Sequence, residues 1–258
     1  MMNKKPLILI TNDDGYKAKG IQALTDALKG LGEIVVFAPE SHRSGMSRAI
    51  TPSVPLRVKL SRREEDLTVY RCSGTPVDCV KLAMHSFVDR QPDLLVSGIN
   101  HGTNSAISVH YSGTMGAAIE GCIFGIPSIG FSLCSYEADA DFSSAAAVAR
   151  TLTQRILQEG LPEGICLNVN IPYGTVNGIR PATQTRGKWI NEFLRSHDGL
   201  GREVFWLTGT FDNWEPENEE SDEWALANGY AAVVPVRIDT TAHDYLSELR
   251  KMPEGNEQ

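Results

Sequence analysis

Two adjacent aspartates, Asp13 and Asp14, come after the apolar residues 7–10, a Thr and an Asn, and a glycine follows them. A short apolar run is typical of a buried strand. Neighbouring carboxylates repel each other and raise each other's pKa unless a positive charge lies between them. A hard cation such as Mg²⁺ prefers oxygen ligands, so this pair could hold one at the carboxyl end of the strand. Asn, Asp and Gly are also common turn residues, and the stretch alone fits an ion-free turn equally well.

Two other loops carry polar side chains that could complete such a site. Residues 41–48, which include Ser44, contain hydroxyls, a glycine and two arginines, and these suit an anion or a cation shell. Asn100 follows a short apolar strand, and its amide oxygen could bind a hard ion. In open α/β sheets, ligands bind at the carboxyl edge, where these loops would meet. Taken singly, residues 41–48 also fit a solvated loop, and His101 fits a hydrogen-bonded loop histidine.

A phosphate site is indicated where Ser112, Gly113 and Thr114 open a helix rich in Ala and Gly that runs to about Phe124. The first N–H groups of a helix have no partner within it, and the helix dipole makes this end positive, so anions bind there. The small residues of this helix would let it pack closely on a sheet.

The spacing of apolar residues predicts the elements that would position these side chains. Apolar residues at three- and four-residue intervals predict a helix over 20–31, and residues 33–38 predict a second buried strand. Strand, helix and strand in close succession form a βαβ unit, which implies a parallel sheet. The first strand is followed by neither Gly-x-Gly-x-x-Gly nor a Walker lysine, so the usual dinucleotide and NTP cradles are missing. Further strands are expected over 125–133 and 165–172, and a further helix over 144–159.

The last third of the chain has a different character. Residues 178–207 predict a long hairpin or arm with its turn near Asp198 and Gly199. Its aromatic side chains would suit a subunit interface, although a satellite core within one chain is the alternative. These aromatic residues are Trp189, Phe193, Phe205 and Trp206. We therefore divide the chain into an α/β core over 1–177 and a C-terminal extension over 178–258.

An acidic segment follows the expected arm. Residues 212–223 contain seven acidic residues and no basic one. Because these charges have no ordered spacing and no apolar strand frames them, we expect a solvated loop rather than a metal site. Residues 224–228 predict a short helix, and residues 231–236 predict a strand that returns to the fold.

The composition is that of an ordinary soluble globular protein, with 258 residues of which 41% are hydrophobic and 22% charged. A net charge of -8 argues against a nucleic-acid polymer as partner. No apolar run is long enough to span a membrane, and the run near the N-terminus is too short for a signal peptide. Five scattered cysteines without a Cys-x-x-Cys pair predict buried thiols in a reducing compartment, and so a cytoplasmic protein.

Six motifs in register resemble the SurE (survival protein E) nucleotidases. The resemblance covers most of residues 7–172 in the right order, and the last third of the chain is compatible but less specific. The motifs are Thr11-Asn12-Asp13-Asp14-Gly15, Arg43-Ser44-Gly45, Gly74-Thr75-Pro76-Val77-Asp78-Cys79, Ser97-Gly98-Ile99-Asn100-His101-Gly102, Tyr111-Ser112-Gly113-Thr114-Met115-Gly116-Ala117-Ala118 and Leu167-Asn168-Val169-Asn170.

The resemblance implies a Rossmann-like, three-layer α/β fold with a mostly parallel sheet and a divalent-metal phosphatase site. The implied substrates are nucleoside 5′-monophosphates, with 3′-monophosphates and short polyphosphate as further substrates. It also implies a homodimer or homotetramer that exchanges C-terminal arms. The implied ligands of one Mg²⁺ or Mn²⁺ are Asp13, Asp14, Ser44 and Asn100, of which the two aspartates are also the catalytic residues. The implied phosphate-binding residues are Ser112, Gly113 and Thr114, with Asn104 from the preceding loop.

Two departures from the family pattern lie at the expected mouth of the site. His42 stands where an Asn is usual, and residues 104–110 replace a stretch that often carries Gly and acidic residues. The nucleophile stays open between an activated water and an Asp carboxylate. Gly15 stands where an Asp-x-Asp motif would have its second Asp, which argues against a haloacid-dehalogenase mechanism. The alternatives are a nucleotide-sugar transferase, which would need a second α/β domain, and a non-catalytic module that binds nucleotide or metal.

Overall fold

The apolar run near the start of the chain forms β1 (Leu7–Thr11), and all five of its residues are buried. The structure, a computed structural model, describes residues 5–252. After β1 the chain forms α1 (Lys19–Leu28), and β2 (Glu33–Pro39) then runs parallel to β1. The predicted βαβ unit is therefore present, although α1 ends at Leu28 rather than at residue 31.

Nine strands of the described residues form one sheet, in the order β3-β4-β2-β1-β5-β6-β7-β13-β8. Neighbouring strands are parallel except in the pairs β3 with β4 and β7 with β13. The predicted α/β fold with a mostly parallel sheet is confirmed. The remaining strands of this sheet are β3 (Val58–Glu64), β4 (Leu67–Cys72), β5 (Leu94–His101), β6 (Ser128–Cys134), β7 (Ile165–Pro172), β8 (Ile179–Pro181) and β13 (Ala231–Arg237).

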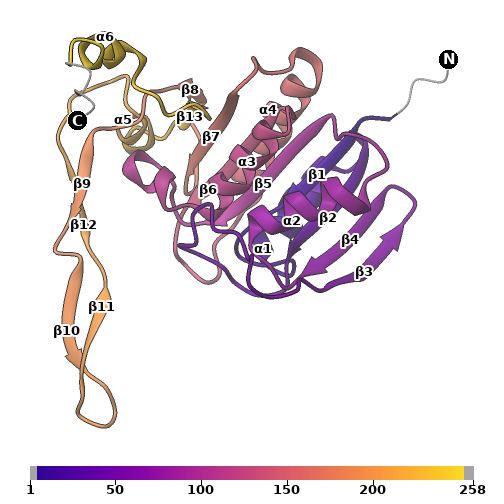
Figure 1. Cartoon of the computed structure of the whole chain (residues 1–258), viewed down its shortest axis with the longest axis horizontal. Helices are drawn as coiled ribbons and strands as arrows, with labels where there is room; N and C mark the ends of the chain where they lie inside the picture. Colours follow the sequence, from indigo (N-terminus) through magenta and orange to yellow (C-terminus); the bar gives the residue numbers. More distant parts are fainter. Residues whose placement is uncertain (1–4, 253–258) are drawn as a thin grey trace, which may run out of the picture.

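Helices cover both faces of the sheet and make three layers (Figure 1). On one face, α1 and α4 (Ser143–Glu159) pack against the sheet through aliphatic side chains. On the other face lie α2 (Pro76–Leu82), which continues into the π-helical turn η1 (Ala83–Phe87), and α3 (Gly113–Ile123). α3 approaches the sheet closely, because a Cβ on Gly121 would lie only 2.5 Å from Ser128 Oγ. This close packing brings the start of α3 to the carboxyl edge of the central strands.

The predicted arm is present, but it is built from two short ladders rather than one hairpin (Figure 1). Its strands run from Gly187 to Asn213 rather than over 178–207, because residues 179–181 form β8 of the main sheet. At its base, β9 (Gly187–Ile190) pairs with β12 (Thr210–Asn213), and at its tip β10 (Phe193–His197) pairs with β11 (Glu203–Leu207). The two ladders meet where Asn191 and Gly209 have φ values of +53° and +130°. The turn at the tip lies near Asp198 and Gly199, as predicted. It closes with Asp198 N donating to Arg202 O.

The expectation of a solvated loop over 212–223 is wrong at both ends. Asp212 belongs to β12, and Asp222 opens α5 (Asp222–Ala227) and is completely buried. The number of acidic residues did not predict this burial, because a single carboxylate can be buried when enough N–H and O–H donors converge on it. β13 then returns to the sheet as predicted, and η3 (His243–Tyr245) and α6 (Leu246–Leu249) follow. The division of the chain at residue 177 stays a prediction. Within residues 5–252, each helix is too short or too polar to cross a membrane.

Candidate active site

Asp13 and Asp14 lie in the turn after β1, at the carboxyl end of the parallel strands. The side chain of Asn12 closes this turn, because its Nδ2 donates to Gly15 O at 3.1 Å and its Oδ1 accepts from Gly15 N at 3.2 Å. Gly15 has a φ of +101°, a conformation that residues with a Cβ rarely adopt. The local sequence therefore does form a tight turn, and this turn places both carboxylates at the sheet edge.

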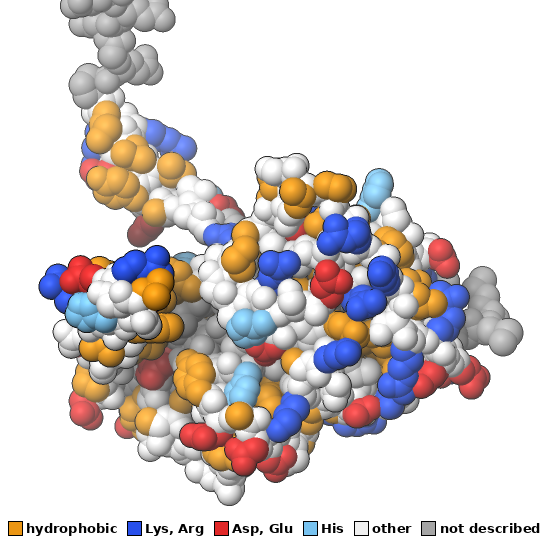
Figure 2. All heavy atoms as spheres, turned by 90° about the horizontal axis from the view of Figure 1, so that it is seen from below, with side chains coloured by type: hydrophobic (Ala, Val, Ile, Leu, Met, Phe, Trp, Pro, Cys, Tyr) orange, Lys and Arg blue, Asp and Glu red, His pale blue; other side chains and the backbone are white. Residues whose placement is uncertain are grey.

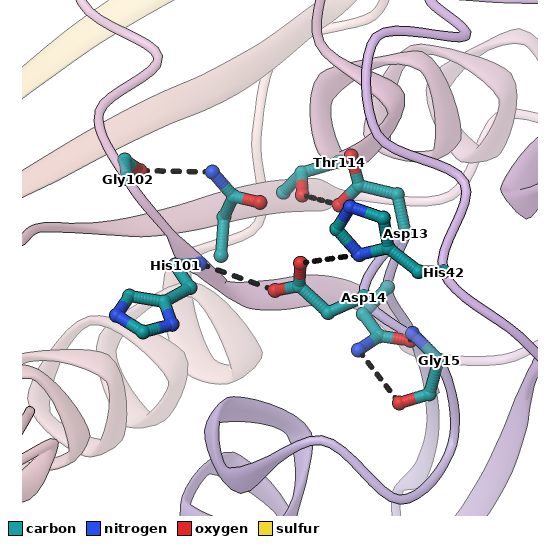
Figure 3. Close-up of polar contacts among 9 residues, drawn as sticks. Asp13, Asp14, Gly15, His42, His101, Gly102 and Thr114 are labelled. Atoms are coloured by element: carbon teal, nitrogen blue, oxygen red, sulfur yellow. Dashed lines mark hydrogen bonds and ion pairs between the residues drawn. The ribbon is translucent and has the colours of Figure 1, made fainter. Parts of the chain in front are cut away.

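Asp13 is only 3% exposed, and its carboxylate faces the start of α3 (Figure 3). Its Oδ1 accepts a hydrogen bond of 2.5 Å from Thr114 Oγ1. A Cβ on Gly113 would lie 2.8 Å from Asp13 Oδ2, so the helix backbone passes very close to the carboxylate. Burial raises the pKa of Asp13 to about 6, because the Thr114 hydrogen bond offsets only part of the lost hydration and the Asp14 charge adds to the shift.

Asp14 joins the turn after β1 to the end of β5 and to the loop after β2 (Figure 3). Its Oδ2 accepts from His101 N at 3.1 Å, and its Oδ1 lies 3.4 Å from Nδ1 of His42, a side chain that is 68% exposed. Burial raises the pKa of Asp14 as well, while the His101 hydrogen bond and the two imidazoles lower it. His42, which departs from the family pattern, therefore contacts one of the predicted metal ligands directly.

Asn100 and Ser44 reach the same edge from the ends of β5 and β2. Asn100 is buried, and its Nδ2 donates to Gly102 O at 2.8 Å, which leaves its Oδ1 to serve as a ligand. The register of β5 against β6 shifts between Ser97 and Asn100, an irregularity of the kind that re-aims side chains beside active sites. Ser44 is exposed in the loop after β2.

A pocket of about 360 Å³ brings five of the eight predicted site residues together. Asp14 instead lines a neighbouring pocket that shares His101 and Tyr136 with the first. Gly113 and Thr114 are buried behind Asp13. The five residues that line the first pocket are Asp13, Ser44, Asn100, Asn104 and Ser112.

The start of α3 has the form predicted for a phosphate site. Ser112 is the N-cap, and its Oγ accepts from Met115 N at 3.0 Å. The helix geometry leaves the backbone N–H groups of Gly113 and Thr114 without an acceptor in their own helix. Asn104 is less free to bind phosphate than the sequence suggests, because its Nδ2 already donates to Ser132 Oγ at 2.8 Å.

A buried polar network holds the loop that carries Asn104. Asn170 Oδ1 accepts from Asn104 N at 2.7 Å, and Asn168 Nδ2 donates to Asn104 O at 2.9 Å. Asp222 Oδ2 accepts from Ala106 N at 2.8 Å, where Ala106 has a φ of +48°. Two asparagines spaced two apart on a buried strand point to one face, which is a signal for their shared role. Asp222 gives no such signal, because the segment that contains it reads as a solvated loop.

The arm also contributes to the pocket, which sequence reasoning missed. Four arm residues line the pocket, although none of them belongs to the six sequence motifs. The contact joins positions that are far apart in the chain, so no local pattern could reveal it. These residues are Trp189, Glu192, Leu207 and Thr208.

The donor set of the site fits a hard divalent cation. Within residues 5–252, no cluster of three or more His, Cys, Asp or Glu side chains with metal-binding geometry is present. The predicted ligands include only two residues of those types, together with an amide and a hydroxyl, and all four side chains offer oxygen. In the described chain, His42 is the one basic side chain with a nitrogen within 4 Å of either carboxylate. Burial and the Asp14 charge both raise the pKa of Asp13, and a divalent cation would supply the positive charge that stabilises its ionised form.

Comparison with known proteins places this geometry in a family. The family model described as "Survival protein SurE" matches residues 8–191. The chain belongs to the SurE family. The chain is 57% identical to a SurE protein of Phocaeicola vulgatus and 53% identical to one of Bacteroides thetaiotaomicron. These matches cover 97% and 96% of this chain and 98% and 96% of the relatives, and both relatives are named 5′-nucleotidase SurE.

A solved structure supports the same assignment. The SurE protein of Aquifex aeolicus superposes with a TM-score of 0.82 at 36% identity, over 95% of this chain and 98% of that one. The predicted family is confirmed, and the enzyme class expected from the SurE motifs agrees with the names of the relatives.

Proposed function

We propose that this protein is a metal-dependent 5′-nucleotidase, which hydrolyses nucleoside 5′-monophosphates to a nucleoside and phosphate. The observation that carries the proposal is the meeting of Asp13, Ser44 and Asn100 with the N-cap of α3 in one pocket. The 5′-nucleotidase names of close relatives support the same reaction. An oxygen-donor site beside a helix N-terminus suits a phosphate monoester better than an uncharged substrate.

Asp13, Asp14, Ser44 and Asn100 would hold one Mg²⁺ or Mn²⁺. A divalent cation bound there would screen the phosphate charge and lower the pKa of a nearby water. The chain has already restrained two of the proposed ligands, because Thr114 Oγ1 orients the Asp13 carboxylate and Gly102 O orients the Asn100 amide. Pre-positioned ligands reduce the reorganisation that binding requires.

The start of α3 would receive the phosphoryl group. In hydrolysis a water oxygen bonds to phosphorus while the bond from phosphorus to the ester oxygen breaks, and that oxygen leaves with a proton as the nucleoside hydroxyl. Negative charge on the other phosphoryl oxygens would lie beside the N–H groups of Gly113 and Thr114, where the helix dipole stabilises it. Asp13 and Asp14 would accept hydrogen bonds from this water and so orient it.

Three further properties are part of the proposal. Nucleoside 3′-monophosphates and short polyphosphate present the same terminal phosphoryl group, so the site would accept them as well. Exposed Phe193 and Trp206, 67% and 63% exposed, would bury their apolar surface when arms from two or four copies associate. All five cysteines are free, and four of them are buried, which fits a reducing compartment such as the cytoplasm.

A phosphate-release screen tests this function. Purified protein is incubated with nucleoside 5′- and 3′-monophosphates and polyphosphate, in EDTA and then with Mg²⁺ or Mn²⁺ restored. We expect release only with metal, and nearly complete loss of turnover in Asp13→Asn with its circular dichroism unchanged. Retained metal-dependent turnover in that variant would remove Asp13 from the site.

The alternatives make opposite predictions in the same screen. No release from any nucleotide with either metal would favour a non-catalytic module that binds nucleotide or metal. A nucleotide-sugar transferase is disfavoured because the described residues after β7 form an arm, two sheet strands and short helices rather than a second α/β domain.

A further inference from the structure

The base of the arm forms one wall of the active-site pocket. Trp189 lies on β9, and Glu192 and Thr208 lie at the junction between the two ladders of the arm. Thr208 N donates to Glu192 O at 2.7 Å, so this junction is a defined structure. Figure 2 views the molecule from the end to which the arm points, and it shows a hollow between arm and body. The pocket volume of about 360 Å³ falls within the usual range of small-molecule sites.

The indole ring of Trp189 is held in place by its neighbours. Phe211, on the paired strand β12, packs against it edge to face, with the ring centroids 6.0 Å apart. A Cβ on Gly209 would lie 3.2 Å from Trp189 Cε3, so the ring rests directly on the arm backbone. The ring is only partly buried and lines the pocket. Trp189 therefore presents a rigid aromatic surface to whatever occupies the site.

The pocket has the same chemical polarity as a nucleoside monophosphate. Asp13, Asn100 and Ser112 bring oxygens and a helix N-terminus to it, whereas Trp189 brings an aromatic surface from the arm. A nucleotide likewise carries an anionic phosphoryl group at one end and a flat aromatic base at the other. Stacking on an aromatic side chain tolerates every base, because each base has a π-face.

We propose that Trp189 is a specificity-determining residue that stacks on the base of the nucleotide while the phosphoryl group lies at Asp13 and the start of α3. This rests on the proposed nucleotidase function and adds to it the recognition of the nucleoside half. Glu192 is the neighbouring acceptor for a ribose hydroxyl or an exocyclic amino group of the base. Phosphate esters that lack a base would make no stacking contact with Trp189.

The test compares a substrate with a base to one without. For Trp189→Ala, kcat and KM are measured with adenosine 5′-monophosphate and with ribose 5-phosphate. Loss of one aromatic–base stack weakens binding by about 5- to 150-fold. We therefore expect KM for the nucleotide to rise by about that factor, with kcat changed little and both parameters for ribose 5-phosphate unchanged. Trp189→Phe should restore most of the preference for the nucleotide.

Trp214→Ala is the matched control. Trp214 follows β12, is 56% exposed and does not line the pocket, so its loss should leave both substrates unaffected. Equal loss for both substrates in Trp189→Ala would assign Trp189 a purely structural role and overturn the proposal. Unchanged kcat/KM for both substrates would also overturn it, while leaving the nucleotidase function intact.

A binding measurement separates this proposal from the function on which it rests. Adenosine, which has no phosphate, should quench the tryptophan fluorescence of the wild-type protein and of Trp214→Ala but not of Trp189→Phe. If the wild type hydrolyses no nucleotide, the proposed function fails, and quenching by adenosine still decides whether Trp189 contacts a base.

Discussion

Replacing Asp13 with Asn should stabilise the metal-free protein at neutral pH while it abolishes turnover. The Asp13 pKa is about 6 in the folded protein and 3.8 in the reference state, so the folded state holds its proton over about two pH units in which the unfolded chain has lost it. Stability therefore falls as pH rises from about 4 to about 6, and it stays lower above that window. At 1.36 kcal/mol per pH unit, the ionised carboxylate costs about 3 kcal/mol at pH 7.5.

Asn removes this charge and still accepts from Thr114 Oγ1. Its amide N–H groups need partners in a site that was built for a carboxylate, which reduces the gain by about 1–2 kcal/mol. We therefore expect Asp13→Asn to raise the free energy of unfolding by about 1–2 kcal/mol at pH 7.5 in EDTA. The gain should disappear toward pH 4, where the wild-type carboxyl is also protonated and only the cost of the amide N–H groups remains.

Urea denaturation of both proteins in EDTA at a series of pH values measures this effect. Asp26→Asn is the control, because Asp26 is 68% exposed and its loss should change stability by less than about 0.5 kcal/mol. Adding Mg²⁺ or Mn²⁺ should then stabilise the wild type and have a smaller effect on Asp13→Asn. A gain of the same size at pH 4 and pH 7.5 would refute the charge argument, and equal stabilisation of both proteins by metal would show that Asp13 is not a ligand.

Two other substitutions test how the site is held. Gly113→Ala would place a Cβ 2.8 Å from Asp13 Oδ2, whereas an ordinary contact is about 3.5–4.0 Å, so the carboxylate must move by about 1 Å. We expect kcat to fall by about 100-fold with little change in the melting temperature. An unaltered kcat would contradict this geometry. Asp222→Ala removes the acceptor of the N–H groups of Ala106 and Thr185, at 2.8 and 3.0 Å. It should lower the free energy of unfolding by about 2–4 kcal/mol and expose both amides to hydrogen exchange, whereas amides that remain protected would argue against this role.

Local patterns in the sequence determined the elements around the site. The apolar residues 7–10 form β1, because a run of apolar side chains is stable only where both faces of a strand are covered. Ser112 caps α3, because its hydroxyl satisfies an N–H group within three residues. The Asp13–Asp14 turn forms through bonds between Asn12 and Gly15. Such features depend on neighbours within a few positions, so the printed sequence is enough to predict them.

The tertiary structure alone decided which distant groups complete the site. Thr114 binds Asp13 across 101 positions of the chain, and Trp189 reaches the same pocket from the arm. Asp222 is buried although its segment is acidic, because donors from Ala106 and Thr185 converge on it. These contacts follow from strand order, register and the path of the arm, which depend on the packing of the whole chain. Short-range periodicity and capping contain no information about them.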